Sequence, residues 1–317
     1  STYTQSGFKF TDWRYTQSAV DTSSLKTFAS VPIATSISSS ATVPTAGRYD
    51  LVQLGSMSGT TGISTTNITW NGCVEERDTV NSLFPGATPP SGAFDHDLRS
   101  APSNTATTWH PYIGDLEFDR GQTATLDTST NISAEAERCP ATARKFTTVD
   151  TSDPATVPGW LETYIGTLAA DGNTYHDIGM VWGARLANPN GIMATNVTEG
   201  NLSAISRHII MMTDGEMKPN RTVYSSYGLE RYDNRVAPSG TSDTSLTSYH
   251  NARFLTACQS AKNMGYTIWF VAFGEALTPE MTACATPGHA LFAGDSASLA
   301  NTFRHIASQI ADLRLHS

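Results

Sequence analysis

The sequence predicts an α/β protein whose second half forms a parallel sheet, joined to an irregular, β-rich first half. The first observation is the apolar run at 208–213, which ends at Asp214 and Gly215. Such a run is typical of a strand buried on both faces, as in parallel sheets. The second is a similar run at 266–273, which ends at Gly274. The third is a helical stripe after each run, at 251–264 and 296–313, and alternating strands and helices favour a parallel sheet under helices.

Residues 1–153 are predicted to form a β-rich, disulfide-pinned insert region. Short alternating runs at 7–11 and 115–119 suggest strands, and Ser/Thr/Pro/Gly tracts at 36–45 and 85–92 separate them. No amphipathic helix is expected before Leu161. The acids of the stretch 71–78 are interpreted as a solvated or ion-paired face beside Arg77 rather than as metal ligands.

Residues 154–317 are predicted to form the second unit. It starts near Pro154, where apolar residues begin to recur at helical spacing. A first helical stripe places apolar groups at 161, 164, 165 and 168. A second helix follows Thr174, which is a plausible N-cap, and Asp177 resembles a capping-box acid. Residues 217–247 form a long polar loop with three tyrosines, which either contact a partner or pack the loop onto the domain.

Four cysteines allow three disulfide pairings, and their order along the chain suggests Cys73–Cys139 and Cys258–Cys284. An even number of cysteines in a Ser/Thr-rich chain favours an oxidising compartment outside the cytoplasm. The alternative is four separate buried thiols. Zinc is not expected, because the chain has no CxxC motif and no Cys/His cluster.

The net charge of −9 and the absence of a basic stripe argue against a nucleic-acid partner. No apolar run reaches the length of a membrane span. The chain has no signal peptide and does not open on Met, so we interpret it as a mature or truncated product.

Asp214 is the main candidate for a site, because open α/β sheets place ligands at the carboxyl ends of their strands. A carboxylate there needs a partner, and a hard cation held by oxygen ligands would supply one. The alternative is a turn in which the aspartate bonds nearby backbone amides. An enzyme built on His176, Asp177 and Ser225 or Ser226 is not favoured, since no GxSxG elbow, phosphate loop or dinucleotide fingerprint occurs.

The second half resembles the von Willebrand factor A domain family. The resemblance rests on the helix at 161–168 followed by Gly172 and Thr174, the run ending in Thr213-Asp214-Gly215, and the strand ending in Phe273-Gly274. It implies a doubly wound, Rossmann-type sheet with a metal-ion-dependent adhesion site at its carboxyl edge. Thr174 and Asp214 match two of the Mg²⁺ ligands of that family, with Glu216 and Asp177 as weaker neighbours.

Several short sequence segments resemble those of the TadG-like proteins of the TadE/TadG family, which take part in the assembly of bacterial tight-adherence pili. These segments are at 70–77, 173–179, 212–217 and 307–315. One departure is the absence of the family's DxSxS loop, since the nearest string, at 21–25, has Leu in place of the second Ser and lacks a preceding buried strand. The chain therefore looks like a C-terminal portion of a membrane-anchored parent. Its sheet would lack the first strand, which an upstream cleaved fragment, another chain or the insert would supply.

The resemblance implies a non-enzymatic adhesion or pilus-associated protein with a metal-dependent contact face. It also implies an extracytoplasmic location in the periplasm, on the outer surface or in secreted form, and protein partners in a pilus or surface assembly. The alternative is a purely structural minor subunit in which the metal site is degenerate.

Overall fold

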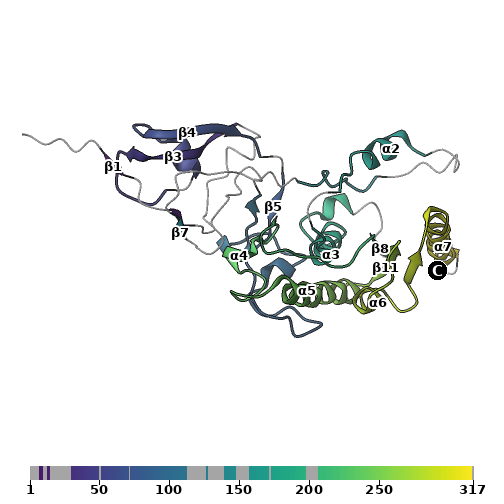
Figure 1. The fold of residues 1–317 in the computed structure, drawn as a ribbon. Coiled ribbons are helices and arrows are strands. Elements are labelled where there is room, and N and C mark those ends of the chain that lie inside the picture. Colours follow the sequence, from purple (N-terminus) through teal and green to yellow (C-terminus); the bar gives the residue numbers. More distant parts are fainter. Residues whose placement is uncertain are drawn as a thin grey trace, which may run out of the picture.

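The computed structural model describes residues 7–9, 13–14, 30–49, 51–70, 72–112, 126–127, 139–147, 157–170, 173–197 and 206–315. Over these ranges the chain is a mixed α/β protein (Figure 1). The predicted strand at 115–119 and the string at 21–25 lie outside the described residues.

The first half is built around an antiparallel hairpin of β3 (Val31–Val43) and β4 (Thr61–Ile68), with β1 (Phe8–Lys9) on the other edge of β3. Helix α1 (Leu51–Ser56) packs on this sheet, so the expectation of no helix before Leu161 applies only to longer amphipathic helices. The tract at 36–45 was expected to separate strands, which is wrong for residues 36–43. Val31 and Ile33 are buried in one apolar cluster and Ala34, Ile37 and Ala41 in a second, and this burial stabilises the strand despite its polar residues.

Short antiparallel pairs complete the described part of the first half. They are β2 (Trp13–Arg14) with β7 (Leu126–Asp127), and β5 (Val74–Glu75) with β6 (His110–Pro111). Single 3₁₀ turns occur at Phe94–His96 and Thr105–Thr107. The 3₁₀ turns lie in the segment 72–112, which packs against the second half of the chain.

The second half contains a parallel sheet with the strand order β12–β11–β8. The strands are β8 (Arg207–Thr213), β11 (Tyr266–Phe273) and β12 (Ala290–Ala293). Strands are confirmed at 208–213 and 266–273, and they pair with Ile209 opposite Ile268. The expected burial on both faces holds for β11 and is wrong for β8, where Ile210 and Met212 are exposed on one face. The four-residue strand β12 was not predicted, because it is too short to show a period.

Helices cover the two faces of this sheet differently. On one face, α3 (His176–Leu186) and α5 (Asp243–Asn263) enclose a core that includes Met180, Phe254 and Phe270. On the other face, α7 (Ser296–Leu315) covers β11 and β12, and Trp269 and Val271 are buried there with Ile306. This arrangement supports the α/β class predicted from the alternation of strands and helices.

The helix boundaries correct two expectations. Helix α5 begins at Asp243 rather than at 251, because Ser242 caps it by accepting a hydrogen bond from the backbone N–H of Ser245. The N-cap of α3 is Tyr175 and makes no side-chain capping bond, so the assignment of Thr174 as N-cap is wrong.

The remaining elements are α2 (Gly159–Ile165), a 3₁₀ turn (Ala194–Asn196), β9 (Tyr224–Ser225), β10 (Gly228–Leu229), α4 (Glu230–Asp233) and α6 (Pro279–Cys284).

The structure forms two disulfides, Cys73–Cys139 and Cys258–Cys284, the pairing that chain order predicts. The second links α5 to α6 beside the core, where both cysteines are buried. Among the described residues, no helix combines the length and the hydropathy needed to cross a membrane.

Candidate functional site

Asp214 follows the last residue of β8 and is exposed at the carboxyl edge of the parallel sheet. The turn beneath it is held by the hydroxyl of Thr213, which donates to the carbonyl of Gly215 at 3.1 Å and accepts from the N–H of Gly215 at 3.3 Å. His176 Nε2 lies 3.2 Å from the same hydroxyl. The hydroxyl of Thr213, and not the Asp214 carboxylate, therefore bonds the backbone of this turn.

Thr174 lies beside the segment that follows Asp214. It forms an isolated β-bridge with Lys218, in which the Lys218 N–H donates to the Thr174 carbonyl at 3.0 Å. Glu216 is exposed and lies 3.6 Å from the Lys218 ammonium, a solvated pair of small energetic value. The structure thus brings the segments of Thr174, Asp214 and Glu216 to one end of the sheet.

Asp177 is in a different place. It lies on α3 with no exposed surface, and its Oδ2 is 2.7 Å from Nδ1 of His250 on α5. Burial alone would raise the pKa of Asp177, but the charge and hydrogen bond of His250 bring the pKa below its ordinary value. Its carboxylate therefore helps to join two helices and is not a neighbour of the exposed edge.

The oxygen donors at the sheet edge are of the hard type that Mg²⁺ takes, a hydroxyl from Thr174 and carboxylates from Asp214 and Glu216. Among the described residues, no group of three or more His, Cys, Asp or Glu side chains could hold a metal ion. An octahedral ion at this edge would need further ligands from water or from another chain.

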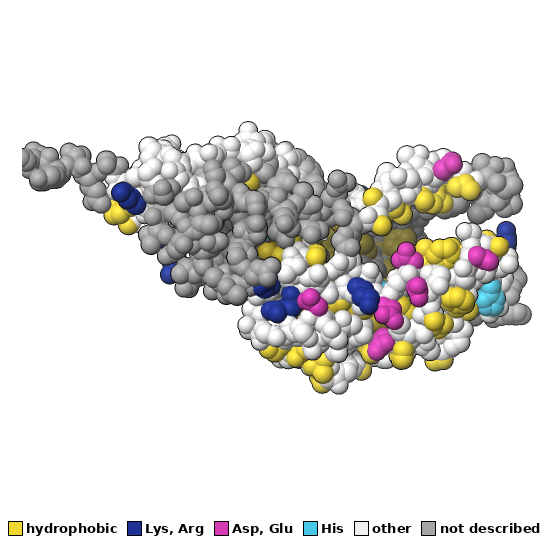
Figure 2. Space-filling view, viewed as in Figure 1, with side chains coloured by type: hydrophobic (Ala, Val, Ile, Leu, Met, Phe, Trp, Pro, Cys, Tyr) yellow, Lys and Arg dark blue, Asp and Glu magenta, His cyan; other side chains and the backbone are white. Residues whose placement is uncertain are grey.

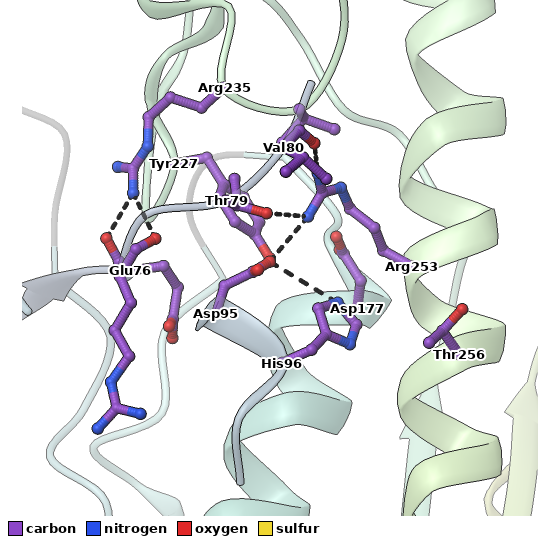
Figure 3. A network of polar contacts seen from close by, with 12 residues as sticks. Glu76, Thr79, Val80, Asp95, His96, Asp177, Tyr227, Arg235, Arg253 and Thr256 are labelled. Atoms are coloured by element: carbon purple, nitrogen blue, oxygen red, sulfur yellow. Dashed lines mark hydrogen bonds and ion pairs between the residues drawn. The ribbon is translucent and has the colours of Figure 1, made fainter. Parts of the chain in front are cut away.

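A second group of polar side chains was missed by sequence reasoning. It is a buried network that joins the segment 72–112 to α3, α5 and the loop at 224–237 (Figure 3). The carboxylate of Glu76 accepts two hydrogen bonds from Arg185 on α3, at 2.9 and 3.3 Å. Both side chains are 1% exposed. The expected face beside Arg77 is therefore ion-paired at this acid, and the solvated alternative is wrong because Glu76 is buried against an arginine of the second half.

Asp95 is the centre of the network and is fully buried. Its Oδ2 accepts hydrogen bonds from Arg253 Nη1 at 2.7 Å and from the Tyr227 hydroxyl at 2.9 Å. His96 Nε2 lies 3.7 Å from the same oxygen. Burial lowers the pKa of His96, and burial together with the Asp95 charge raises the pKa of Tyr227 well above its ordinary value.

Glu75 anchors the long loop that follows β8. Its carboxylate accepts from Arg235 at 3.2 Å and from the Tyr224 hydroxyl at 2.6 Å. Tyr112 stacks on Tyr224 with ring centroids 4.2 Å apart. Of the two possibilities for the loop tyrosines, the structure supports packing onto the domain for Tyr224 and Tyr227, whereas the side chain of Tyr232 lies outside the described residues.

The two groups differ in what they can do chemically. In the buried network, Glu75, Glu76 and Asp95 are each paired with an arginine, which favours a structural role. The Ser225 hydroxyl, a candidate in the enzyme alternative, bonds within the β9–β10 hairpin, with the carbonyl of Gly228 and the N–H of Tyr227. The exposed sheet edge, in contrast, presents oxygen donors to solvent and can meet a ligand.

Comparisons of the chain with models of protein families, with curated proteins and with solved structures gave no match.

Proposed function

We propose that the chain is a non-enzymatic adhesion or pilus-associated protein that contacts a partner through the carboxyl edge of its parallel sheet. One observation carries this proposal: Asp214 is exposed directly after β8, with the Thr174 segment bridged beside it at Lys218. Open α/β sheets bind their ligands at the carboxyl ends of their strands, which is where this exposed carboxylate lies.

The finer fold in this proposal is a von Willebrand factor A-like, doubly wound sheet in a TadG-like protein. The parallel order β12–β11–β8, with α3 and α5 on one face and α7 on the other, supports it. The resemblance of the sequence segments around Thr174 and Asp214 supports the family. The two disulfides support an extracytoplasmic location. The partners would be proteins of a pilus or another surface assembly.

The metal in this proposal is Mg²⁺, held by the Thr174 hydroxyl and the Asp214 carboxylate with Glu216 nearby. A metal that binds only the folded protein raises its stability by mass action. We expect Mg²⁺ to raise the thermal unfolding midpoint of the unchanged chain and of Glu162→Gln, which alters an exposed acid on α2. The midpoint of Asp214→Asn should not respond. An equal response of all three proteins, or no response in any, would contradict a metal site at this edge.

The second candidate is a structural minor subunit in which the acid at the sheet edge no longer binds metal. The small number of ligands at this edge favours it, since no group of three or more His, Cys, Asp or Glu side chains among the described residues could hold a metal ion. A photo-cross-linking residue placed at Glu216 in producing cells distinguishes the two. Capture of a surface-assembly protein that depends on Mg²⁺ supports the adhesion function, and capture that is insensitive to metal chelation supports the structural subunit.

A further inference from the structure

Strand β4 lies at an edge of the antiparallel sheet of the first half. The order in that sheet is β1–β3–β4, so β4 pairs with β3 on one side. On its other side, none of the described strands pairs with it. Figure 1 shows β4 along the upper margin of the first half. An edge strand of this kind presents a row of backbone N–H and C=O groups that can pair with a further strand.

The edge of β4 lacks the features that usually protect an edge strand, which are charged residues, proline and bulges. The strand contains no charged residue and no proline. The two register shifts of the hairpin place their additional residues in β3 and not in β4. The other described edge strands have four residues or fewer, apart from β8, which contains Arg207. Among the described strands, β4 therefore has the edge that is most open to pairing.

The side chains of β4 suit pairing with an identical strand. Thr65, Thr66 and Asn67 are exposed. Threonines that lie opposite each other on neighbouring strands stabilise a sheet through hydrogen bonds between their hydroxyls. The hairpin already contains such a pair, because Thr42 of β3 is opposite Thr61 of β4 and their hydroxyl oxygens are 2.7 Å apart. A second copy of β4 can form the same kind of pair.

The charge of the chain restricts where two copies can approach each other. Its net charge of −9 makes the copies repel. The hairpin is neutral, because residues 31–47 and 51–70 contain no Asp, Glu, Lys or Arg, and the charges of Arg48 and Asp50 cancel. In Figure 2 the described surface over β3 and β4 is mostly white, whereas Asp and Glu side chains gather towards the end that holds the parallel sheet. Contact at the β4 edge is therefore the least opposed by charge.

We propose that the open edge of β4 pairs with β4 of a second copy of the chain, antiparallel and about a two-fold axis perpendicular to the sheet. The two three-stranded sheets then become one continuous sheet. This inference goes beyond the proposed function and does not depend on it, because β4 is not part of the sheet that carries Asp214.

The two-fold axis fixes which side chains meet. A two-fold interface uses the same surface of both copies, so a residue near the axis lies opposite its own equivalent. In an antiparallel pair, opposite residues share one face of the sheet. The axis therefore places Thr65 opposite the same residue of the second copy or, in the next allowed register, Thr66 opposite its equivalent. Both registers form a threonine pair, and neither brings like charges together.

Sedimentation equilibrium of the 317-residue chain over a range of concentrations tests the proposal. We expect the average mass to rise reversibly from 34.0 kDa towards twice that value. The double variant Thr65→Lys/Thr66→Lys places like charges opposite each other in either register, so it should dimerise at least tenfold more weakly. The matched control Thr282→Lys should dimerise like the unchanged chain, because Thr282 is exposed on α6 in the second half.

A charge exchange separates edge pairing from a general loss of structure. The double variant Thr65→Glu/Thr66→Glu should also dimerise weakly by itself. Mixed with Thr65→Lys/Thr66→Lys, it should form heterodimers, because opposite charges then lie across the strand pair. If either double variant does not fold by circular dichroism, hydrogen exchange of the β4 amides in the unchanged chain decides the proposal. That exchange should slow as the concentration rises.

Three outcomes would overturn the proposal. The first is a mass that stays at 34.0 kDa up to about 1 mM, which corresponds to a negligible affinity. The second is a dimer that both double variants form as strongly as the unchanged chain. The third is a dimer whose formation leaves the exchange of the β4 amides unchanged.

Discussion

At the scale of single residues, the central feature is the burial of charge. Asp95, Arg253, Glu76 and Arg185 are each at most 1% exposed. Removing such groups from water is costly, and the cost is offset only when geometry and hydrogen bonds are good. Arg253 offsets part of this cost by donating to Asp95, to the hydroxyl of Thr79 and to the carbonyl of Val80, although its Nε and the Oδ1 of Asp95 have no hydrogen-bond partner.

Arg253→Met tests this pairing. The variant leaves the carboxylate of Asp95 buried without its cation, so we expect the free energy of unfolding to fall by about 3–5 kcal/mol. Urea unfolding followed by circular dichroism measures the change. The matched control Arg304→Met removes an exposed arginine of α7 and should change the free energy by less than about 0.5 kcal/mol. A loss below about 1 kcal/mol for Arg253→Met would show that Asp95 does not depend on this cation.

At the scale of elements, α5 organises the second half. Its 21 residues contact α3, α6 and β11, and its N-terminus is capped by Ser242. The Cys258–Cys284 disulfide closes a loop with a sequence separation of 26 residues and links α5 to the short helix α6. A six-residue helix such as α6 is not stable in isolation, so this link and its own capping box at Thr278 hold it in place.

The double variant Cys258→Ala/Cys284→Ala tests the link. Opening a loop of this length removes a constraint on the unfolded chain, and we expect the free energy of unfolding to fall by about 3 kcal/mol. Chemical denaturation gives the value. The unchanged protein under a reducing agent should lose at least this amount, because the reducing agent also opens the Cys73–Cys139 disulfide. Equal stability of the oxidised protein and the double variant would contradict a stabilising disulfide.

At the scale of the whole molecule, the buried network joins parts that are far apart in sequence. The segment 72–112 supplies Glu75, Glu76 and Asp95, and the second half supplies the arginines that bind them. The buried ion pairs therefore cross the boundary that was predicted at residue 153. Because this buried network contains titratable groups, the free energy of unfolding of the protein depends on pH.

Acidification is expected to lower the free energy of unfolding in two stages. Burial puts the pKa of His96 below its ordinary 6.5, so the unfolded chain binds the proton first and stability falls as pH drops below 6.5. The charges around His96 are Asp95, Arg253, Asp177 and Arg185. Because the pKa of Asp177 also lies below its ordinary value of 3.8, a further loss follows below that pH.

Unfolding measured at several pH values between 7 and 5 checks the first stage. The variant His96→Gln cannot take up this proton and should show a smaller loss of stability over this range. Part of the slope should remain, because burial also lowers the pKa of His176. Equal slopes for the unchanged protein and His96→Gln would contradict the role of His96.

Features that are encoded locally could be predicted from the sequence alone. The apolar runs predicted β8 and β11, helical stripes predicted α2, α3 and α7, and the order of the cysteines predicted both disulfides. The position of Asp214 at a strand end was also predictable, because an apolar run followed by Asp and Gly defines where the strand stops.

Which side chains meet could not be predicted in this way, because it depends on how distant segments pack together. Glu76 and Arg185 are 109 residues apart, and Asp177 and His250 are 73 apart. Local periodicity reports the face of an element that is buried and carries no information on the partner across the core. For the same reason, the acids of the stretch 71–78 were expected to form a solvated or ion-paired face, and the fold alone placed Glu75 and Glu76 against arginines in the interior.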